Sequence, residues 1–193
     1  MQHPAITDAH GSGGRRMFLG LRPPGALTRA WLQTARRAVG DRPGLRWLAP
    51  EDVHLTVRFL GAVDALQEAR LNDALVAGLE GQATFDVDTR QAMWFPAASQ
   101  PVVLAVVVVP GAVLAALASL VNAAVARVGL PPDPRPFRPH ISLARAGGPR
   151  SRVLPAAPDL PAARFSACDL ILFESLGNDT VPRYRPRRVF RFD

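Results

Sequence analysis

The chain of 193 residues has a mass of 20.8 kDa, which suits one domain with a core of its own and excludes a large multidomain assembly. Hydrophobic residues make up 48% and charged residues 20%, with a single cysteine, so the composition excludes disordered, collagenous and disulfide-rich proteins. Basic residues outnumber acidic ones by 23 to 16, and the net charge of +7 favours a nucleotide or nucleic acid as partner, although a GC-rich coding bias explains why all 23 are arginine.

The first half of the chain opens with turn-forming residues and continues with strand and helix patterns. Residues 1–14 mix Pro, Gly, Ser and Asp without an apolar period, so we expect a mobile tail ahead of a single domain over residues 15–193. The tail lacks the apolar stretch of a secretion signal, and we expect a reducing, cytoplasmic environment. The next patterns predict a strand over Arg16–Arg22, a helix over Gly25–Gly40 and a strand over His54–Leu60 that ends at Gly61.

A long uncharged run from Pro101 to Ala126 would cross a bilayer only as one continuous helix. Its first part, Val102–Val109, is almost pure valine and predicts a buried strand. Pro110 and Gly111 then interrupt the chain before an Ala- and Leu-rich stretch of good helix propensity. We therefore predict a strand and a helix here, and no contact with a membrane.

The remaining patterns predict further strands, one more helix and two loops. We expect Cys168 to be a small buried residue and the three tryptophans to belong to the core. The predicted elements are a helix over Asp64–Leu79, strands over Phe85–Val87 and Ala92–Phe95, a strand opened by His140, one strand over Phe165–Glu174, a terminal strand over Arg187–Phe192, and loops over 131–139 and 147–161.

An offset of 86 residues superimposes the two halves of the chain, since it carries His54 onto His140. The same offset carries Arg16–Arg22 onto Val102–Val108 and the helix that begins at Gly25 onto the one that begins near Gly111. Each half therefore contains a strand, a helix and a strand opened by histidine. We predict an α+β fold of two lobes of antiparallel sheet with flanking helices, related by an approximate two-fold axis about a central groove.

Two of the four histidines, His54 and His140, lie in segments predicted to fold, whereas the other two lie in the tail. Each opens a strand in the order His, aliphatic, hydroxyl, aliphatic. Side chains alternate across a strand, so each histidine shares a face with Thr56 or Ser142 while the aliphatic residues face the core. One such tetrapeptide is common in ordinary strands, but two copies in matching halves place two imidazoles and two hydroxyls across one groove.

These motifs and their flanks resemble the 2H phosphoesterase superfamily, in particular its RNA 2′,3′-cyclic phosphodiesterases, also called 2′,5′-RNA ligases. The resemblance rests on RMFLGLRPP, on RWLAPEDVHLTVRFLG and on FRPHISLAR, and it extends from Arg16 to near the C-terminus. Serine at Ser142 and glycine at Gly20, where the family often has threonine and alanine, are mild departures. The resemblance implies an enzyme that hydrolyses 2′,3′-cyclic phosphate ends of RNA or nucleotides to 2′-phosphomonoesters, with 2′,5′ ligation as a side activity. We expect it to act as a monomer.

Opening a cyclic phosphate with water requires a base for the water proton, an acid for the departing ribose oxygen and donors for the other phosphate oxygens. Two histidines and two hydroxyls supply these groups without a metal ion or another cofactor. We assign His54 as general acid and His140 as general base, with Thr56 and Ser142 as phosphate ligands. The near symmetry of the two motifs leaves the exchanged roles open, and either assignment predicts a bell-shaped pH profile of kcat/KM.

Several arginines are candidates for charge partners of the phosphate. The resemblance assigns Arg145 to this role, although its odd offset from His140 requires a bulge or strand end near Ala144. Arg58 has an even offset from His54 and shares its face by simple alternation, either toward the groove or as a solvated residue on its rim. Arginines around Tyr184 form either a guide for an RNA backbone, with the tyrosine stacked on a base, or an ordinary basic surface: Arg183, Arg185, Arg187, Arg188 and Arg191.

Two other functions remain open at this point. A related 2H phosphodiesterase for another cyclic or 2′,5′-linked substrate would use the same residues. A nucleotide- or RNA-binding module would keep the groove without turnover, but the intact pairs of histidine and hydroxyl argue against it.

Overall fold

The structure, a computed structural model, describes residues 14–97, 100–147, 154–177 and 180–193. The predicted mobile tail over residues 1–14 therefore lies outside the described residues, except for Gly14. Within the described part of the chain, three α-helices and nine strands surround one main apolar core. The helices are α1 (Gly25–Val39), α2 (Ala65–Gly78) and α3 (Ala112–Arg127).

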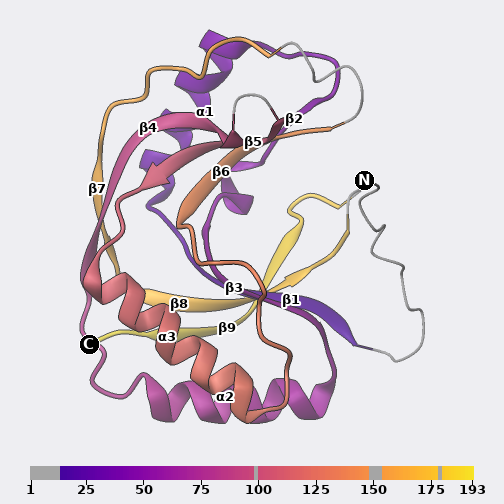
Figure 1. The fold of residues 1–193 in the computed structure, drawn as a ribbon, viewed down its shortest axis with the longest axis vertical. Helices are drawn as coiled ribbons and strands as arrows, with labels where there is room; N and C mark the ends of the chain where they lie inside the picture. The colour runs from indigo at the N-terminus through magenta and orange to yellow at the C-terminus, as the bar shows by residue number, and fades with distance from the viewer. Residues whose placement is uncertain (1–13, 98–99, 148–153, 178–179) are drawn as a thin grey trace.

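The strands of the described residues form one curled sheet in which paired neighbours run antiparallel, in the order β7-β4-β5-β6-β3-β1-β8-β9, with β2 paired to β6 beside that path (Figure 1). The strands are β1 (Arg15–Leu21), β2 (Leu45–Trp47), β3 (Leu55–Val63), β4 (Phe85–Ala97), β5 (Gln100–Val108), β6 (His140–Ala146), β7 (Arg164–Ala167), β8 (Asp169–Ser175) and β9 (Tyr184–Arg191).

The strand order is symmetric about the contact between β6 and β3, which confirms the predicted two-lobed α+β fold. One lobe contains β7, β4, β5 and β6, and the other contains β3, β1, β8 and β9. The strands β1 and β5, which the offset of 86 residues superimposes, occupy equivalent places, as do β3 and β6. The outer strands are exchanged between the halves, because β4 of the first half pairs with β5 and β8 of the second half pairs with β1.

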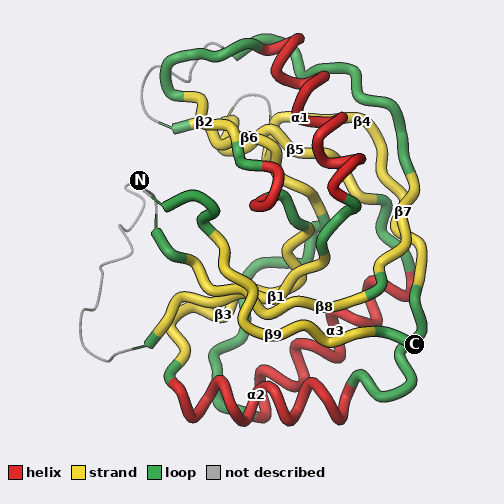
Figure 2. The backbone as a smooth tube through the Cα atoms, turned by 180° about the vertical axis from the view of Figure 1, so that it is seen from behind, coloured by secondary structure: helices red, strands yellow, loops and turns green. Residues whose placement is uncertain are grey.

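The helices cover the two lobes from different ends of the molecule. Both views show α2 and α3 side by side below the lobe of β1, β8 and β9, whereas α1 lies at the other end, with β4 and β5 (Figures 1 and 2). The α2 helix begins with a capping box in which Asp64 accepts from the Gln67 backbone N–H and the Gln67 side chain accepts in return. The helix α3 packs on α2 and on β3, so a helix of the second half covers a strand of the first.

The structure corrects several predicted elements. The segments Phe85–Val87 and Ala92–Phe95 belong to one strand, β4, which runs through an irregularity in its register with β5. The predicted strand over Phe165–Glu174 is two strands, because β7 pairs with β4 in one lobe and β8 pairs with β1 in the other. Cys168 lies at this crossing between the lobes and is exposed, so the prediction that it is buried was wrong.

The uncharged run after Pro101 divides as predicted, into the end of β5 at Val108 and the start of α3 at Ala112. Among the described helices, none has both the length and the apolar character that a membrane span requires.

Candidate active site

The two histidine motifs meet where β3 pairs with β6, through the residues Leu55 and Ile141. Extending this antiparallel register by one residue on each side places His54 opposite Ser142 and Thr56 opposite His140. Leu55 and Ile141 are completely buried, so the other face of the strands carries the motif histidines and hydroxyls, as predicted. Both histidines and both hydroxyl residues line one cleft of about 910 Å³.

Each motif contains an extra residue, a β-bulge, directly after its hydroxyl residue. The bulge reverses the side of the sheet from which the later residues of that strand project. In β6, Ser142 pairs with Ala105 and Ala144 with Leu104, so Leu143 has no partner on β5. The bulge brings Arg145 to the same face as Ser142, and Arg145 lines the cleft. The irregularity that the sequence required near Ala144 is therefore present.

The equivalent bulge in β3 has the opposite effect on Arg58. Thr56 pairs with Gly20 and Arg58 with Leu19, which leaves Val57 unpaired and turns Arg58 to the side of the buried Leu19. Arg58 still lines the cleft, but from the opposite face of the strand to His54, and its side chain is 5% exposed, so the prediction of a shared face and that of a solvated residue are wrong while its place at the groove is confirmed.

The buried guanidinium of Arg58 instead holds the loop that leads to the second motif. It donates a hydrogen bond to the carbonyl of Pro131 and lies 3.8 Å from a carboxylate oxygen of Asp133. Asp133 in turn accepts two hydrogen bonds from the Arg135 side chain, at 3.0 and 3.1 Å, and these contacts lower the pKa of the carboxyl. Arg58 is thus a structural support for one wall of the cleft.

His54 is held in a single orientation by its neighbours. Its Nδ1 lies 2.6 Å from the backbone carbonyl of Asp52, so Nδ1–H donates to that carbonyl, and its Nε2 lies 3.1 Å from Thr56 Oγ1. The ring stacks on Phe18 with centroids 4.5 Å apart and meets the edge of Tyr184 at 5.0 Å. Burial among these rings lowers the pKa of His54 to about 4, and Arg145 and Arg22 add to this effect.

His140 is held in the same way on the opposite side of the cleft. Its Nδ1 lies 2.8 Å from the carbonyl of Arg138, and its ring stacks on Phe95 at 4.3 Å. The guanidinium of Arg138 lies over the Phe95 ring, 4.5 Å from its centroid. Burial lowers the pKa of His140, with smaller contributions from Arg138 and Arg145. In both histidines a backbone carbonyl occupies Nδ1, so Nε2 is the nitrogen that can exchange a proton with a ligand, in His54 beside the hydroxyl of Thr56.

Sequence reasoning missed Asp52, which connects the first motif to the start of β9. Its buried carboxylate accepts hydrogen bonds from the backbone N–H groups of Arg183 and Tyr184, at 2.8 and 3.1 Å. The Tyr184 hydroxyl lies 3.5 Å from a terminal nitrogen of Arg145, so the tyrosine touches both motifs. The only sequence signal for Asp52 is its place two residues before His54, where its own carbonyl orients the imidazole.

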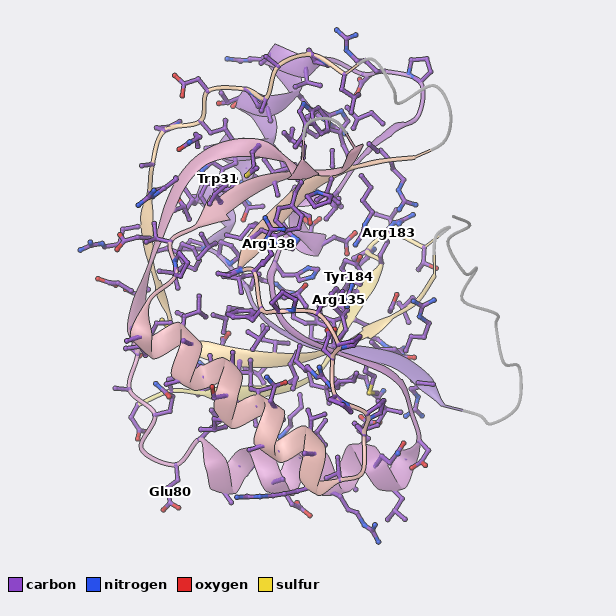
Figure 3. The ribbon with its side chains drawn as sticks, in the orientation of Figure 1. Trp31, Glu80, Arg135, Arg138, Arg183 and Tyr184 are labelled. Atoms are coloured by element: carbon purple, nitrogen blue, oxygen red, sulfur yellow. The ribbon has the colours of Figure 1, made fainter. Side chains whose placement is uncertain are left out.

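The predicted basic cluster around Tyr184 divides into parts with different surroundings. Figure 3 labels Arg183 and Tyr184, whose backbone N–H groups both donate to Asp52 at the start of β9. Farther along β9, Arg185 donates to Glu174 at 2.7 Å and Arg187 donates to Glu68 at 3.2 Å. These ion pairs support the interpretation of that part as an ordinary basic surface.

A curled antiparallel sheet that presents two His-x-Thr/Ser-x motifs across its central cleft is the architecture of a 2H phosphoesterase. A family model described as the 2′-5′ RNA ligase superfamily matches residues 23–179, and the chain belongs to this family.

Particular relatives agree with this placement. The chain is 30% identical, over 171 residues, to a Geobacillus stearothermophilus protein named RNA 2′,3′-cyclic phosphodiesterase; the match covers 85% of this chain but spans only 54% of that protein. The fold is similar to that of E. coli LigT complexed with 3′-AMP, with a TM-score of 0.75, 25% identity and coverage of 93% of this chain and 98% of the other. A Thermus thermophilus protein, TT0787, shares the fold with a TM-score of 0.74, 23% identity and coverage of 92% and 97%.

Proposed function

We propose that the protein is an RNA 2′,3′-cyclic phosphodiesterase that converts 2′,3′-cyclic phosphate ends of RNA or nucleotides to 2′-phosphomonoesters without a metal ion. The observation that carries the proposal is the matched pair of imidazoles on one cleft, each with Nδ1 bonded to a backbone carbonyl, so that Nε2 is the nitrogen for proton transfer, in His54 beside the Thr56 hydroxyl. The name of the Geobacillus relative supports the same substrate class. We include in the proposal a single domain over residues 15–193 that acts as a cytoplasmic monomer.

In the proposed reaction a water oxygen attacks phosphorus while His140 Nε2 accepts its proton. The bond from phosphorus to the ribose 3′ oxygen breaks, and His54 Nε2–H donates the proton that this oxygen takes up. Thr56, Ser142 and Arg145 donate hydrogen bonds to the non-bridging oxygens, where negative charge increases in the transition state. The phosphate remains on the 2′ oxygen, and solvent restores the two protonation states.

The two halves of the chain contribute different side chains to the cleft at equivalent positions. Phe59 and Arg145 stand five residues after their histidines, and each follows the bulge in its strand. Both line the cleft, where Phe59 is 46% exposed. The side chain at this position is therefore aromatic in one motif and cationic in the other. This pair fits a ligand with an unsaturated ring and a phosphate better than an inorganic ion.

The test of the function is incubation with adenosine 2′,3′-cyclic phosphate in excess chelator, followed by identification of the product. Adenosine 2′-phosphate is expected, and its formation should stop in a His140→Ala variant. A 3′-phosphate product, or turnover of a 2′,5′-linked dinucleotide alone, would assign the protein to a different 2H activity. Binding of the nucleotide with no turnover would make it a binding module.

The assignment of acid and base is tested with a cyclic nucleotide in which sulfur replaces the bridging 3′ oxygen. A thiolate leaves without protonation, so this substrate should restore activity to His54→Ala and leave His140→Ala inactive. Restoration of the His140 variant instead would exchange the two roles. Ligation to a 2′,5′ bond, the proposed side activity, is measured with the same variants and a 5′-hydroxyl acceptor.

A further inference from the structure

The short strand β2, which the sequence analysis did not predict, extends the floor of the active site beyond the two motifs. The strand β3 pairs with β6 only through Leu55 and Ile141, and β2 then pairs with the following part of β6. In this register Arg46 lies directly opposite Arg145, between the pairs formed by Leu45 and by Trp47.

Residues directly opposite each other in an antiparallel pair project from the same face of the sheet. Arg145 projects from the face of Ser142 because of the bulge at Leu143. Arg46 therefore also projects from the catalytic face, beside a guanidinium already assigned to the substrate. Two guanidinium groups on one face can each donate paired hydrogen bonds to the same anion.

A second hollow of about 420 Å³ lies at this end of the sheet. Arg145 lines both this hollow and the catalytic cleft. Among the described residues that line the hollow, none is acidic: they are Gly44, Leu45, Arg46, Arg145, Ala146 and Gly147. Arg46 is exposed.

We propose that Arg46 and Arg145 form a second anion subsite for the phosphodiester that precedes the cyclic phosphate in an RNA chain. The proposal rests on the proposed function, and it specifies the substrate as an RNA end rather than a free cyclic mononucleotide. The terminal nucleotide has its 2′ and 3′ oxygens in the cyclic phosphate, so the rest of the chain joins through its 5′ oxygen. The nearest further phosphate is therefore the one at that oxygen, and guanidinium binds phosphate with paired hydrogen bonds.

The experiment compares kcat/KM for adenosine 2′,3′-cyclic phosphate with that for the dinucleotide ApA ending in the same group. The wild-type protein should prefer the dinucleotide by about tenfold, the lower range for a hydrogen bond to a charged group. Arg46→Gln should abolish this preference and change the mononucleotide value less than about twofold, and Arg46→Lys should keep part of it. Arg70→Gln, an exposed arginine on α2, is the matched control and should keep the full preference.

A mononucleotide with an additional 5′-phosphate separates a phosphate subsite from a contact with the second nucleoside. It should regain most of the preference in the wild-type protein and none in Arg46→Gln. A wild-type ratio near one, or an equal loss on all substrates in Arg46→Gln, would overturn the subsite.

Absence of turnover with every substrate would refute the proposed function instead. The subsite is then decided by calorimetry with ApA ending in a 2′-phosphate against adenosine 2′-phosphate, where Arg46→Gln should weaken only the dinucleotide. Equal affinities of the two ligands for the wild-type protein would contradict the subsite.

Discussion

Acidification from pH 7 to pH 4 should destabilise the folded protein through His54 by about 3 kcal/mol. The side chain is 8% exposed, and burial lowers its pKa from 6.5 to about 4 in the folded state. Between these two values the unfolded chain binds one more proton at this residue than the folded chain does. The free energy of unfolding therefore decreases as the pH falls from 6.5 to 4, by about 1.4 kcal/mol per pH unit.

The assay is urea denaturation of the wild-type protein and of His54→Gln at a series of pH values from 7 to 4. The quantity of interest is the difference between the two free energies of unfolding, because other titrating groups contribute equally to both proteins. Asp52 is one such group: burial raises the pKa of its carboxyl, so it acts in the opposite direction, and the subtraction removes it.

The stability difference between wild type and variant should shrink as the pH falls through this window and stay constant above pH 7. His140→Gln serves as a control, because His140 is only partly buried and its pKa is lowered less strongly. Parallel stability curves for wild type and His54→Gln would refute the reasoning, since they would mean that the imidazole is protonated as easily in the fold as in the unfolded chain.

The lowered pKa values of the two histidines place the maximum of kcat/KM on the acidic side of pH 6.5. At higher pH kcat/KM should decrease about tenfold per pH unit, because both imidazoles of the free protein are then neutral and the reaction needs one of them protonated. A flat profile from pH 6 to 8 would contradict this. Arg145→Gln should lower kcat/KM by roughly 100-fold, as for the loss of one oxyanion donor, without a change in melting temperature. Asp52→Ala should cost about 1–3 kcal/mol of stability by leaving two backbone N–H groups unpaired, whereas Asp52→Asn keeps an acceptor and should cost less. Gly20→Ala should impair both stability and activity, because its Cβ would lie 2.8 Å from the Leu55 carbonyl oxygen and 3.5 Å from His54 Cδ2; normal activity would show that β1 shifts freely.

The repeat and the two motifs could be predicted from the sequence because they depend on local order along the chain. A histidine and a hydroxyl two residues apart share a strand face whatever surrounds them. The offset of 86 residues implied equivalent positions for β3 and β6, and the sheet has them at its centre. These features needed no knowledge of which strands pair.

The remaining features depend on pairing, which simple alternation does not reveal. The bulge at Leu143 was predicted only because the family resemblance assigns Arg145 to the phosphate. Nothing similar predicted the bulge at Val57, which turns Arg58 away from the face of His54. The division of Phe165–Glu174 into two strands follows from their partners in different lobes, while the residues themselves read as one apolar run. Contacts over long separations, such as Asp52 with Tyr184, leave no periodic signal.

The exchange of outer strands between the halves has a consequence for how the chain reaches its final state. During synthesis from the N-terminus, β1 emerges early, but its neighbour β8 follows only at Asp169. Until then one edge of β1 has no partner, and the strands around His54 lack the cover of Phe173. Completion of the lobe of β3, β1, β8 and β9 is therefore among the last events, and a ribosome-bound chain that stops before β8 should expose an apolar edge to chaperones.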